Sequence, residues 1–398
     1  MRKRKTRMVL KLFIFVLCGA ILTIGSLQSQ SQTQTTNSYD VIIKNGKLID
    51  GSGNPWVSGD IAIRGERIVA IGKLKDASAT RVIDAAGLVV SPGFIDMLGQ
   101  SEDALLIDNR SISKLSQGIT TEITGEGQSI APQNELTIAP MQPVLDHYHL
   151  KIDWTDLAGY FKRLEEKTTP LNIGTYVGAA QVREAVLGDV DRVPTPEELE
   201  KMKALVAQAM QQGAFGISTA LIYPPGHYAK TEELIELAKV AAKYDGIYGT
   251  HMRSEGQSEI QAIEEALRIG REAQIPVEIF HLKVSGKTRW GSMPKIVAMI
   301  QAARDAGQDV TANMYPYIAG GTALASSLPP WVADGGQQKL LERLKDPAVR
   351  QKIKLEMASD HPDWENLYFD SGGGNSLKVS LQPEGGKKEV IPAVLLFH

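Results

Sequence analysis

The sequence predicts an α/β fold of the (β/α)8 barrel type, and two observations support this. Two histidines, His251 and His281, lie about thirty residues apart at the ends of short β-branched or aromatic runs, and a helix-like segment, 259–273, joins them. Elsewhere, short apolar runs alternate with helical stretches. In such a barrel the carboxyl ends of neighbouring strands meet at one mouth, so both imidazoles can reach one metal ion. The alternative is that they are unrelated members of the seven histidines in the chain.

The composition is that of an ordinary globular protein. The 398 residues are 43% hydrophobic and carry a formal net charge of −3. This length suits one large α/β domain of about 250 residues plus a small one. The lack of a basic excess argues against a nucleic-acid partner. Because Cys18 is the single cysteine, neither a disulfide framework nor a cysteine-ligated zinc site is expected. The sequence does not indicate an oligomeric state.

Residues 1–36 are predicted to be a signal peptide and polar leader. A basic cluster over 2–7 precedes an apolar run over 12–24 and a stretch rich in Gln, Ser and Thr. This is the order of regions in a secretory signal. The apolar run is shorter than the roughly 20 residues that a membrane-spanning helix needs. We therefore expect export to the periplasm of a bacterium, with an uncleaved N-terminal membrane anchor as the alternative.

Residues 39–92 are predicted to form a compact β-rich domain. Asn45-Gly46 is a strong signal for a hairpin turn, and Arg64-Gly65-Glu66 provides a second turn of this kind. The segment from Arg81 onward leads out of this domain into a buried strand.

The predicted barrel domain covers residues 93–345. A first strand at about 88–95 is followed by apolar runs at 118–124, 171–177, 213–219, 247–251, 276–282 and 309–314. The helices between them include 196–212, 231–244 and 293–306. This spacing suits right-handed βαβ units and a parallel sheet of about seven strands, with the eighth not identifiable. Residues 346–398 are predicted to be an incomplete or aberrant C-terminal segment, which ends on an apolar run that needs a partner.

Seven sequence blocks carry a resemblance to a known family. In order they are VIIKNGKLIDGSGNPW, SPGFIDM, GITTEITGEGQSIAP, GAFGISTALIYPPGHYA, YGTHMRSEG, FHLKVSGKTRWG and ANMYPYIAGGT. Together, over residues 39–331, they resemble the N-acyl-D-amino-acid deacylase (D-aminoacylase) branch of the metal-dependent amidohydrolases, and the chain looks like a C-terminally truncated member. The resemblance implies a distorted (β/α)8 barrel with zinc at its mouth. It also implies a small β-sandwich built from both termini, with 39–92 as its first part.

The chain departs from the family pattern at its expected metal ligands. Leu98 and Gln100 stand where a His-x-His pair belongs, and neither is a good zinc ligand. Glu126 lies one position before the cysteine that the family uses as a ligand, and a carboxylate can replace it. The eighth-strand aspartate, the general base of the family, cannot be assigned. Glu102 and Asp370 are the first candidates to replace it.

His251, His281 and Glu126 are the predicted zinc ligands. A catalytic zinc has three protein ligands and an open position. It lowers the pKa of a bound water towards about 7 and polarises a carbonyl, as hydrolysis of an amide requires. The alternative for Glu126 is a solvated loop carboxylate.

Four further residues are predicted to bind the substrate. Arg253 and Lys283 each follow a proposed ligand by two residues and share its face if the strand continues, so they are placed to pair with a substrate carboxylate. Tyr223 and Tyr315 can donate hydroxyls to that carboxylate or to an oxyanion. The alternatives are a salt bridge of Arg253 with Glu255 and a packing role for the tyrosines. By resemblance, Arg183 is a further candidate, for binding or for structure.

The sequence as a whole predicts an exported zinc-dependent amidohydrolase. Its substrates are expected to be small molecules, N-acyl-D-amino acids or related N-acyl amino acids and D-residue peptides. One alternative is a cyclic-amide amidohydrolase of the dihydroorotase or hydantoinase kind. The other is a catalytically inactive, truncated protein on the same scaffold.

Overall fold

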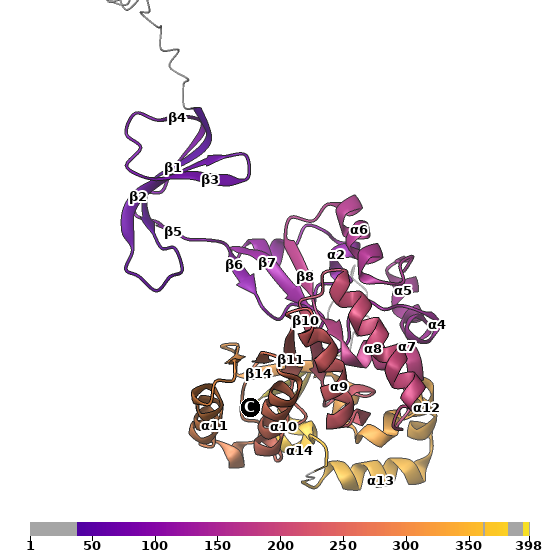
Figure 1. The fold of residues 1–398 in the computed structure, drawn as a ribbon. Coiled ribbons are helices and arrows are strands. Elements are labelled where there is room, and N and C mark those ends of the chain that lie inside the picture. Colours follow the sequence, from indigo (N-terminus) through magenta and orange to yellow (C-terminus); the bar gives the residue numbers. More distant parts are fainter. Residues whose placement is uncertain (1–37, 361–362, 381–392, 398) are drawn as a thin grey trace, which may run out of the picture. The chain divides into compact units, whose positions relative to one another are not determined.

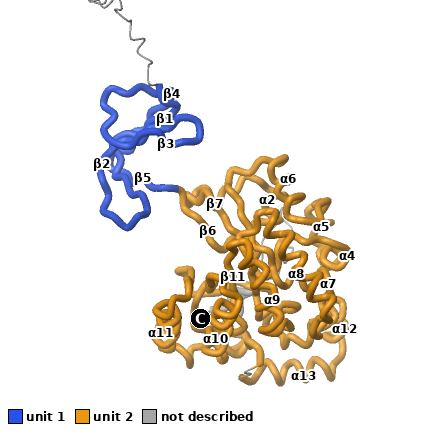
Figure 2. The backbone as a smooth tube through the Cα atoms, viewed as in Figure 1, with its two compact units in different colours: residues 1–92 blue, residues 93–398 orange. Residues whose placement is uncertain are grey.

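The computed structural model describes residues 38–360, 363–380 and 393–397. The chain divides into two compact units, one ending at Pro92 and the other beginning at Gly93 (Figure 2). The predicted signal peptide and leader lie outside the described residues. None of the described helices combines the length and apolar character that crossing a membrane requires.

The first unit contains a single five-stranded sheet (Figure 1). Its strands are β1 (Ser38–Leu48), β2 (Val57–Arg64), β3 (Arg67–Gly72), β4 (Ser78–Asp84) and β5 (Val89–Val90). They follow the order β3-β2-β1-β4, and β5 also pairs with β1. The predicted turn at Gly65 is confirmed, because it joins the antiparallel strands β2 and β3. The predicted hairpin at Asn45-Gly46 is wrong: both residues lie inside β1, where the register with β2 shifts.

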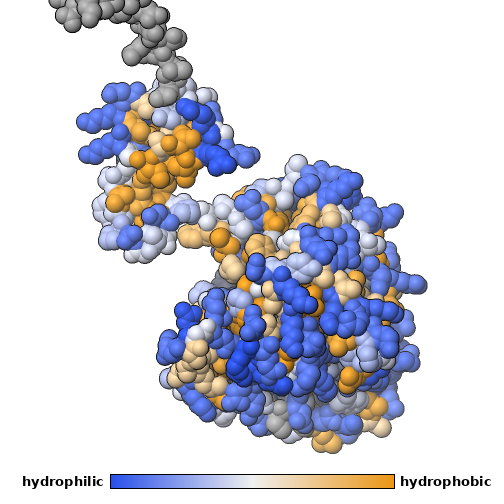
Figure 3. All heavy atoms as spheres, viewed as in Figure 1, coloured by the Kyte–Doolittle hydropathy of each residue, from blue (hydrophilic) through white to orange (hydrophobic). Residues whose placement is uncertain are grey.

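One face of this sheet is apolar and open. Cross-strand pairs place β-branched residues directly opposite one another: Val41 with Ile63, Ile43 with Ile61, Ile61 with Ile71 and Ile63 with Ile68. On the edge strand, Ile68 and Ile71 are 60% and 64% exposed. Figure 3 shows the resulting concentration of apolar atoms on this unit. The second sheet of the predicted sandwich is not found among the described residues of this unit.

The second unit is built on parallel strands. Three form the sheet β6-β7-β8 and five form the sheet β13-β12-β11-β10-β9. Their bounds are β6 (Phe94–Asp96), β7 (Ile119–Thr124), β8 (Asn172–Thr175), β9 (Val177–Gly178), β10 (Gly216–Ala220), β11 (Ile247–His251), β12 (Val277–Ile279) and β13 (Val310–Ala312). Only Tyr176 separates β8 from β9, so the two sheets correspond to the seven predicted strands. In the described part of the chain the outer strands β6 and β13 are not paired with each other.

Helices follow the strands, as the alternating pattern predicted. The longer ones are α6 (Leu157–Lys167), α7 (Ala179–Leu187), α8 (Pro196–Gln211), α9 (Thr231–Ala242), α10 (Glu259–Ala273), α11 (Met293–Asp305), α12 (Gly336–Lys345) and α13 (Pro347–Met357). The short ones are α2 (Ala104–Ile107), α3 (Ile112–Leu115), α4 (Glu135–Ile138), α5 (Gln142–His147) and α14 (Leu367–Asp370). Single 3-10 turns are η1 (Ala139–Met141), η2 (Gly226–Tyr228), η3 (Lys287–Arg289), η4 (Leu324–Ser327), η5 (Pro330–Ala333) and η6 (Gly374–Ser376).

The helix α8 shows how local sequence sets these boundaries. Thr195 caps its N-terminus and Glu198 completes a capping box, while Pro196 occupies the first turn, where a missing N–H costs nothing. Its buried residues, such as Met202 and Val206, join one large apolar core with α9, α10 and the strands β10 to β13. Packing in this core holds the strands in place, and with them the strand ends from which the polar side chains of the site described below extend.

A small antiparallel sheet completes the unit. It has the order β14-β16-β15, with β14 (Ala319–Ala323), β15 (Leu377–Ser380) and β16 (Ala393–Phe397). The apolar run near the end of the chain, for which the sequence required a partner, thus has strands paired on both of its edges.

Candidate metal centre

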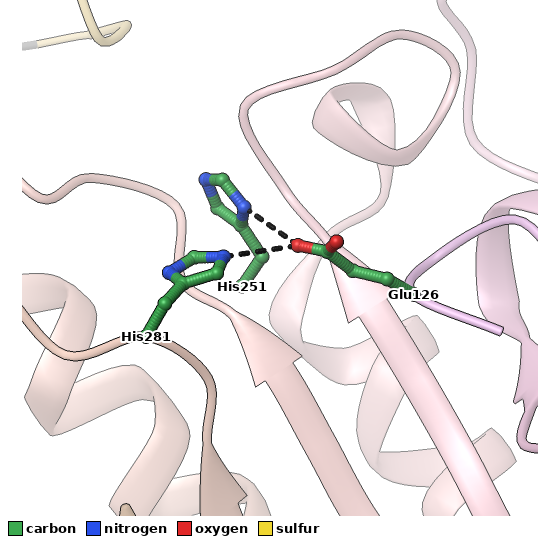
Figure 4. A group of neighbouring side chains, drawn as sticks. All are labelled: Glu126, His251 and His281. Carbon is green, nitrogen blue, oxygen red and sulfur yellow. Dashed lines mark hydrogen bonds and ion pairs between the residues drawn. The ribbon is translucent and has the colours of Figure 1, made fainter. Parts of the chain in front are cut away.

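Three side chains near the ends of β7, β11 and β12 come together, and both histidines face one oxygen of the carboxylate. Oε1 of Glu126 lies 2.9 Å from Nδ1 of His251 and 3.0 Å from Nε2 of His281 (Figure 4). Glu126 follows the carboxyl end of β7, His251 is the last residue of β11, and His281 stands two residues beyond β12. The strand-end convergence that the sequence predicted is therefore present in the structure.

Backbone geometry presents these side chains to one another. Gly125 and Gly127 flank Glu126 with φ of 91° and 70°, values that favour glycine. A Cβ at Gly127 would lie 2.4 Å from the Cβ of Ala220, so the loop approaches β10 too closely for any other residue. His281 itself adopts φ of 37°. Strained conformations of this kind in non-glycine residues cluster at functional sites.

Burial and hydrogen bonding shift the pKa values of Glu126 and His281 in opposite directions. Burial favours a raised pKa for Glu126, but the hydrogen bonds with His251 and His281 outweigh it and hold that pKa below its usual range. Burial lowers the pKa of His251. Burial would also lower the pKa of His281, yet its bonds to Glu126 and Glu255 raise it to about 9. The contacts with Glu126 and Glu255 thus favour the protonated form of His281.

The donor set fits a divalent metal ion. One ligand atom from each residue can be chosen so that all three atoms lie within 4.8 Å of one another, and among the described residues this is the group with that property. Two imidazole nitrogens and one carboxylate oxygen are a ligand set that zinc accepts, and three protein ligands leave a position open. The assignment of the three as metal ligands, made from sequence, stays a proposal.

A cavity of about 110 Å³ opens beside the cluster. Its walls come from the ends of the parallel strands and from β14; they are Gln100, Glu126, Ile222, Tyr223, His251, Glu255, His281, Lys283, Ser285, Tyr315, Gly320, Gly321, Thr322 and Leu367. Three of the five predicted substrate-binding residues, Tyr223, Lys283 and Tyr315, are among them. The Tyr223 hydroxyl lies 2.9 Å from Thr322 Oγ1, and the Lys283 Nζ lies 5.3 Å from the centre of the Tyr315 ring.

The two arginines that the sequence singled out are engaged elsewhere. Arg253 lines a different cavity, pairs with Glu265 at 2.9 Å, and donates to the carbonyls of His227 and Ala229. Its salt-bridge partner is therefore Glu265, whereas the sequence suggested Glu255. Arg183 is fully buried and pairs with Glu233 at 2.6 Å. A role for either arginine in substrate binding stays a prediction.

The two candidate general bases line different cavities. Glu102 lines a cavity shared with Gln100 and Glu126, and burial raises its pKa to about 7. Its Oε1 accepts a 2.7 Å hydrogen bond from the backbone N–H of Gly125. Asp370 lines a separate cavity and is paired with Arg289 at 2.6 Å. Of the two, Glu102 is the one whose cavity is also lined by a proposed ligand, Glu126.

Two residues for which the sequence predicted no role at the metal centre contact the cluster. Gln100 Nε2 donates to the second oxygen of Glu126 at 2.6 Å. Glu255 accepts from Lys283 Nζ at 2.5 Å and lies 2.8 Å from His281 Nδ1. Gln100 could have been indicated by its place at an expected ligand position, whereas no strand pattern indicates Glu255, because β11 ends at His251.

Comparison with known proteins places this arrangement in context. No protein-family model matches the chain. The chain is 41% identical over 297 residues to D-aminoacylase of Alcaligenes xylosoxydans xylosoxydans, which covers 74% of this chain and 60% of that protein. It is 37% identical over 289 residues to N-acyl-D-glutamate deacylase of the same organism, covering 72% and 58%.

Solved structures give the same result. The crystal structure of D-aminoacylase matches with a TM-score of 0.67 and 41% identity, over 71% of this chain and 60% of that chain. N-acyl-D-glutamate deacylase from Bordetella bronchiseptica, in complex with zinc and a phosphonate inhibitor, matches with a TM-score of 0.68 and 34% identity, over 74% and 61%. The chain thus spans about 60% of the length of these relatives.

Proposed function

The chain is a homologue of the D-aminoacylases and N-acyl-D-amino-acid deacylases, and from this relationship we propose that it is a metal-dependent amidohydrolase of N-acyl-D-amino acids. The reaction would cleave the linear amide bond between the acyl group and the amino acid with water. The observation that carries the proposal is the cluster of Glu126, His251 and His281 beside a cavity at the strand ends.

Zinc is the metal that we propose, held by His251, His281 and Glu126. When bound there it would supply an activated water and polarise the amide carbonyl. The protein holds the three ligands in position, and the open side of the cluster faces the cavity lined by Tyr223 and Lys283. A zinc complex of the homologous deacylase from Bordetella bronchiseptica supports this choice.

The free carboxylate of an N-acyl amino acid needs a cation. Lys283 lines the cavity beside His281 and is the cation that we propose for it. The hydroxyls of Tyr223 and Tyr315 are donors for the same carboxylate or for an oxyanion. Burial raises the pKa of Tyr315 to about 12, so this phenol keeps its proton at neutral pH.

The same proposal extends to the fold and the location of the protein. We propose that the parallel strands belong to a (β/α)8 barrel spanning 93–345, that residues 39–92 are the first part of a β-sandwich, and that the protein is exported. Protease accessibility of the protein in intact bacterial cells and in spheroplasts would test export.

Hydrolysis of a panel of N-acetyl-D-amino acids tests the activity directly. We expect zinc-loaded protein to release free amino acid from at least one D-substrate, and His251→Ala to abolish the release. Release from cyclic amides alone would contradict the proposal, and so would the absence of hydrolysis from a folded, zinc-loaded protein. N-acetyl amides that lack the free carboxylate provide the control for the role of Lys283.

A further inference from the structure

Glu255 occupies a central position that the proposed chemistry leaves unexplained. It lies four residues beyond His251 and is only 4% exposed. One carboxylate oxygen, Oε1, lies 2.8 Å from Nδ1 of His281 and 2.5 Å from Nζ of Lys283. The side chain thus links the segment after β11 to the residues that follow β12.

The contacts of His281 assign different tasks to its two ring nitrogens. Nε2 faces Glu126 Oε1 at 3.0 Å, which is the side of the cluster where a metal would bind. A metal on Nε2 requires a lone pair there, so the neutral ring must carry its proton on Nδ1. Lys283 Nζ also lies 2.8 Å from Nδ1. Because an ammonium group can only donate, the acceptor for the Nδ1 proton is Glu255.

His251 lacks comparable support. Its Nδ1 faces Glu126 at 2.9 Å, while its buried Nε2 has no hydrogen-bond partner among the described residues. In metal sites the second ring nitrogen usually donates to a carboxylate or carbonyl, which fixes the tautomer and the ring orientation. Glu255 provides this interaction for His281 only.

Glu255 is itself held firmly in place. Its backbone N–H donates to the carboxylate of Glu365, and its carbonyl accepts a 2.6 Å hydrogen bond from Ser285. The charge of Lys283 compensates that of the buried carboxylate. The backbone hydrogen bonds of Glu255 and the ion pair of its side chain with Lys283 therefore both hold the oxygen that faces His281 in place.

We propose that Glu255 is a positioning residue, which holds the His281 ring with its proton on Nδ1 and thereby presents Nε2 to the metal. This inference rests on the proposed metal centre and adds to it a residue that does not touch the metal. Loss of such a partner typically weakens metal affinity by 10- to 100-fold.

Metal affinity of the Glu255→Gln and Glu255→Ala variants tests the inference. Zinc dissociation constants are measured by competition with a chelator, and the absorption spectrum of the cobalt-substituted protein reports the ligand geometry. We expect about a tenfold weaker affinity for Glu255→Gln, whose amide oxygen still accepts, and up to about 100-fold for Glu255→Ala. The cobalt spectrum should change in both. If Glu255→Ala does not fold, Glu255→Gln alone carries the test.

Glu259→Gln is the matched control. Glu259 is also a buried glutamate, 3% exposed, and its Oε1 has no hydrogen-bond partner among the described residues. The same chemical change there should leave zinc affinity and the cobalt spectrum as in the wild type. An equal loss of zinc affinity in the Glu255→Gln and Glu259→Gln variants would mean that the change of any buried glutamate weakens zinc binding. Positioning of the His281 ring would then not be the cause, which overturns the inference.

His281→Ala separates failure of this inference from failure of the metal centre. If His281→Ala loses zinc while both Glu255 variants bind it as tightly as the wild type, with an unchanged cobalt spectrum, the inference is wrong and the metal centre stands. If His281→Ala binds zinc like the wild type, the metal centre is wrong and the inference fails with it.

Discussion

At the residue scale, Glu126 is the residue whose carboxylate connects His251, His281 and Gln100. Oε1 of Glu126 faces both histidines, and its other oxygen accepts from Gln100 at 2.6 Å. Gln100 stands where the resemblance leads one to expect a metal ligand, and here it donates a hydrogen bond to Glu126, one of the proposed ligands. A single metal with three ligands is the arrangement that these contacts support.

Alanine at either histidine should remove the metal and leave the fold intact. We expect zinc affinity to fall by more than about 100-fold in His251→Ala and in His281→Ala, because loss of an orienting partner alone costs 10- to 100-fold. His251 is the last residue of β11, His281 stands two residues beyond β12, and both side chains line the cavity. Chelator competition measures the affinity and circular dichroism the fold. Unfolding of both variants with the metal still bound would identify the histidines as core residues.

A second residue-scale prediction concerns pH. Glu184 on α7 is 5% exposed, and burial together with the charge of Asp189 raises its pKa from 4.5 to about 8. The folded protein therefore holds a proton that the unfolded chain releases, so stability falls as pH rises from about 4.5 to about 8. The loss is on the order of 5 kcal/mol.

Glu184→Gln should remove this part of the pH dependence, because the amide stays neutral. Urea unfolding of the two proteins at pH 5 and pH 8.5 gives the comparison. The variant should gain stability relative to the wild type at the higher pH. If the free energies of unfolding of the wild type and the variant differ by the same amount at both pH values, Glu184 does not titrate in this range.

At the element scale, the order of strands and helices follows from local sequence more closely than the pairing within a single strand does. The alternation of strands and helices was predictable because apolar runs and amphipathic stretches differ in period, and helix α10 has the predicted bounds, Glu259–Ala273. The bulge in β1 was not predictable. Asn45 has φ of 62°, and an Asn-Gly pair suits both a tight hairpin and a bulge. Pairing along the whole strand, which local sequence does not reveal, decided between them.

The contacts of Arg253 were hidden for a similar reason. Its partner Glu265 lies twelve residues away on α10, and the two carbonyls that it binds belong to the loop containing η2. Sequence spacing indicated the strand ends near which the proposed ligands stand. It could not indicate how the long side chains that follow them would turn.

Gly127→Ala should weaken the metal centre through the loop that carries Glu126. A methyl group there meets Ala220, and the residue has φ of 70°, so the loop must move. We expect weaker zinc binding and a loss of stability of about 1–3 kcal/mol. Thr195→Ala is the control, because loss of the α8 cap should cost about 1 kcal/mol and leave zinc affinity unchanged. Equal zinc affinity in both variants would contradict a role for the loop.

At the scale of the whole molecule, the two units differ in how well they bury apolar surface. The parallel-sheet unit has one large core, whereas the sheet of the first unit leaves Ile68 and Ile71 more than half exposed. An open apolar face next to an edge strand favours self-association. The 398-residue chain is therefore expected to be poorly soluble or to associate.

Ile68→Lys and Ile71→Lys together should reduce this association. Both residues lie on β3, the edge strand, and lysine there opposes edge pairing as well as apolar contact. Sedimentation velocity over a range of concentrations measures the effect, with zinc affinity as the check that the second unit is unchanged. A wild-type chain that stays monomeric at high concentration would refute the expectation.

The zinc content of the purified protein tests the central claim most directly. A single centre formed by His251, His281 and Glu126 predicts about one zinc per chain after loading and dialysis, measured by elemental analysis, and much less than one in His281→Ala. Two tightly held metals would show that Gln100, Glu102 or another group completes a second site. A folded protein that retains no zinc would contradict the metal centre itself.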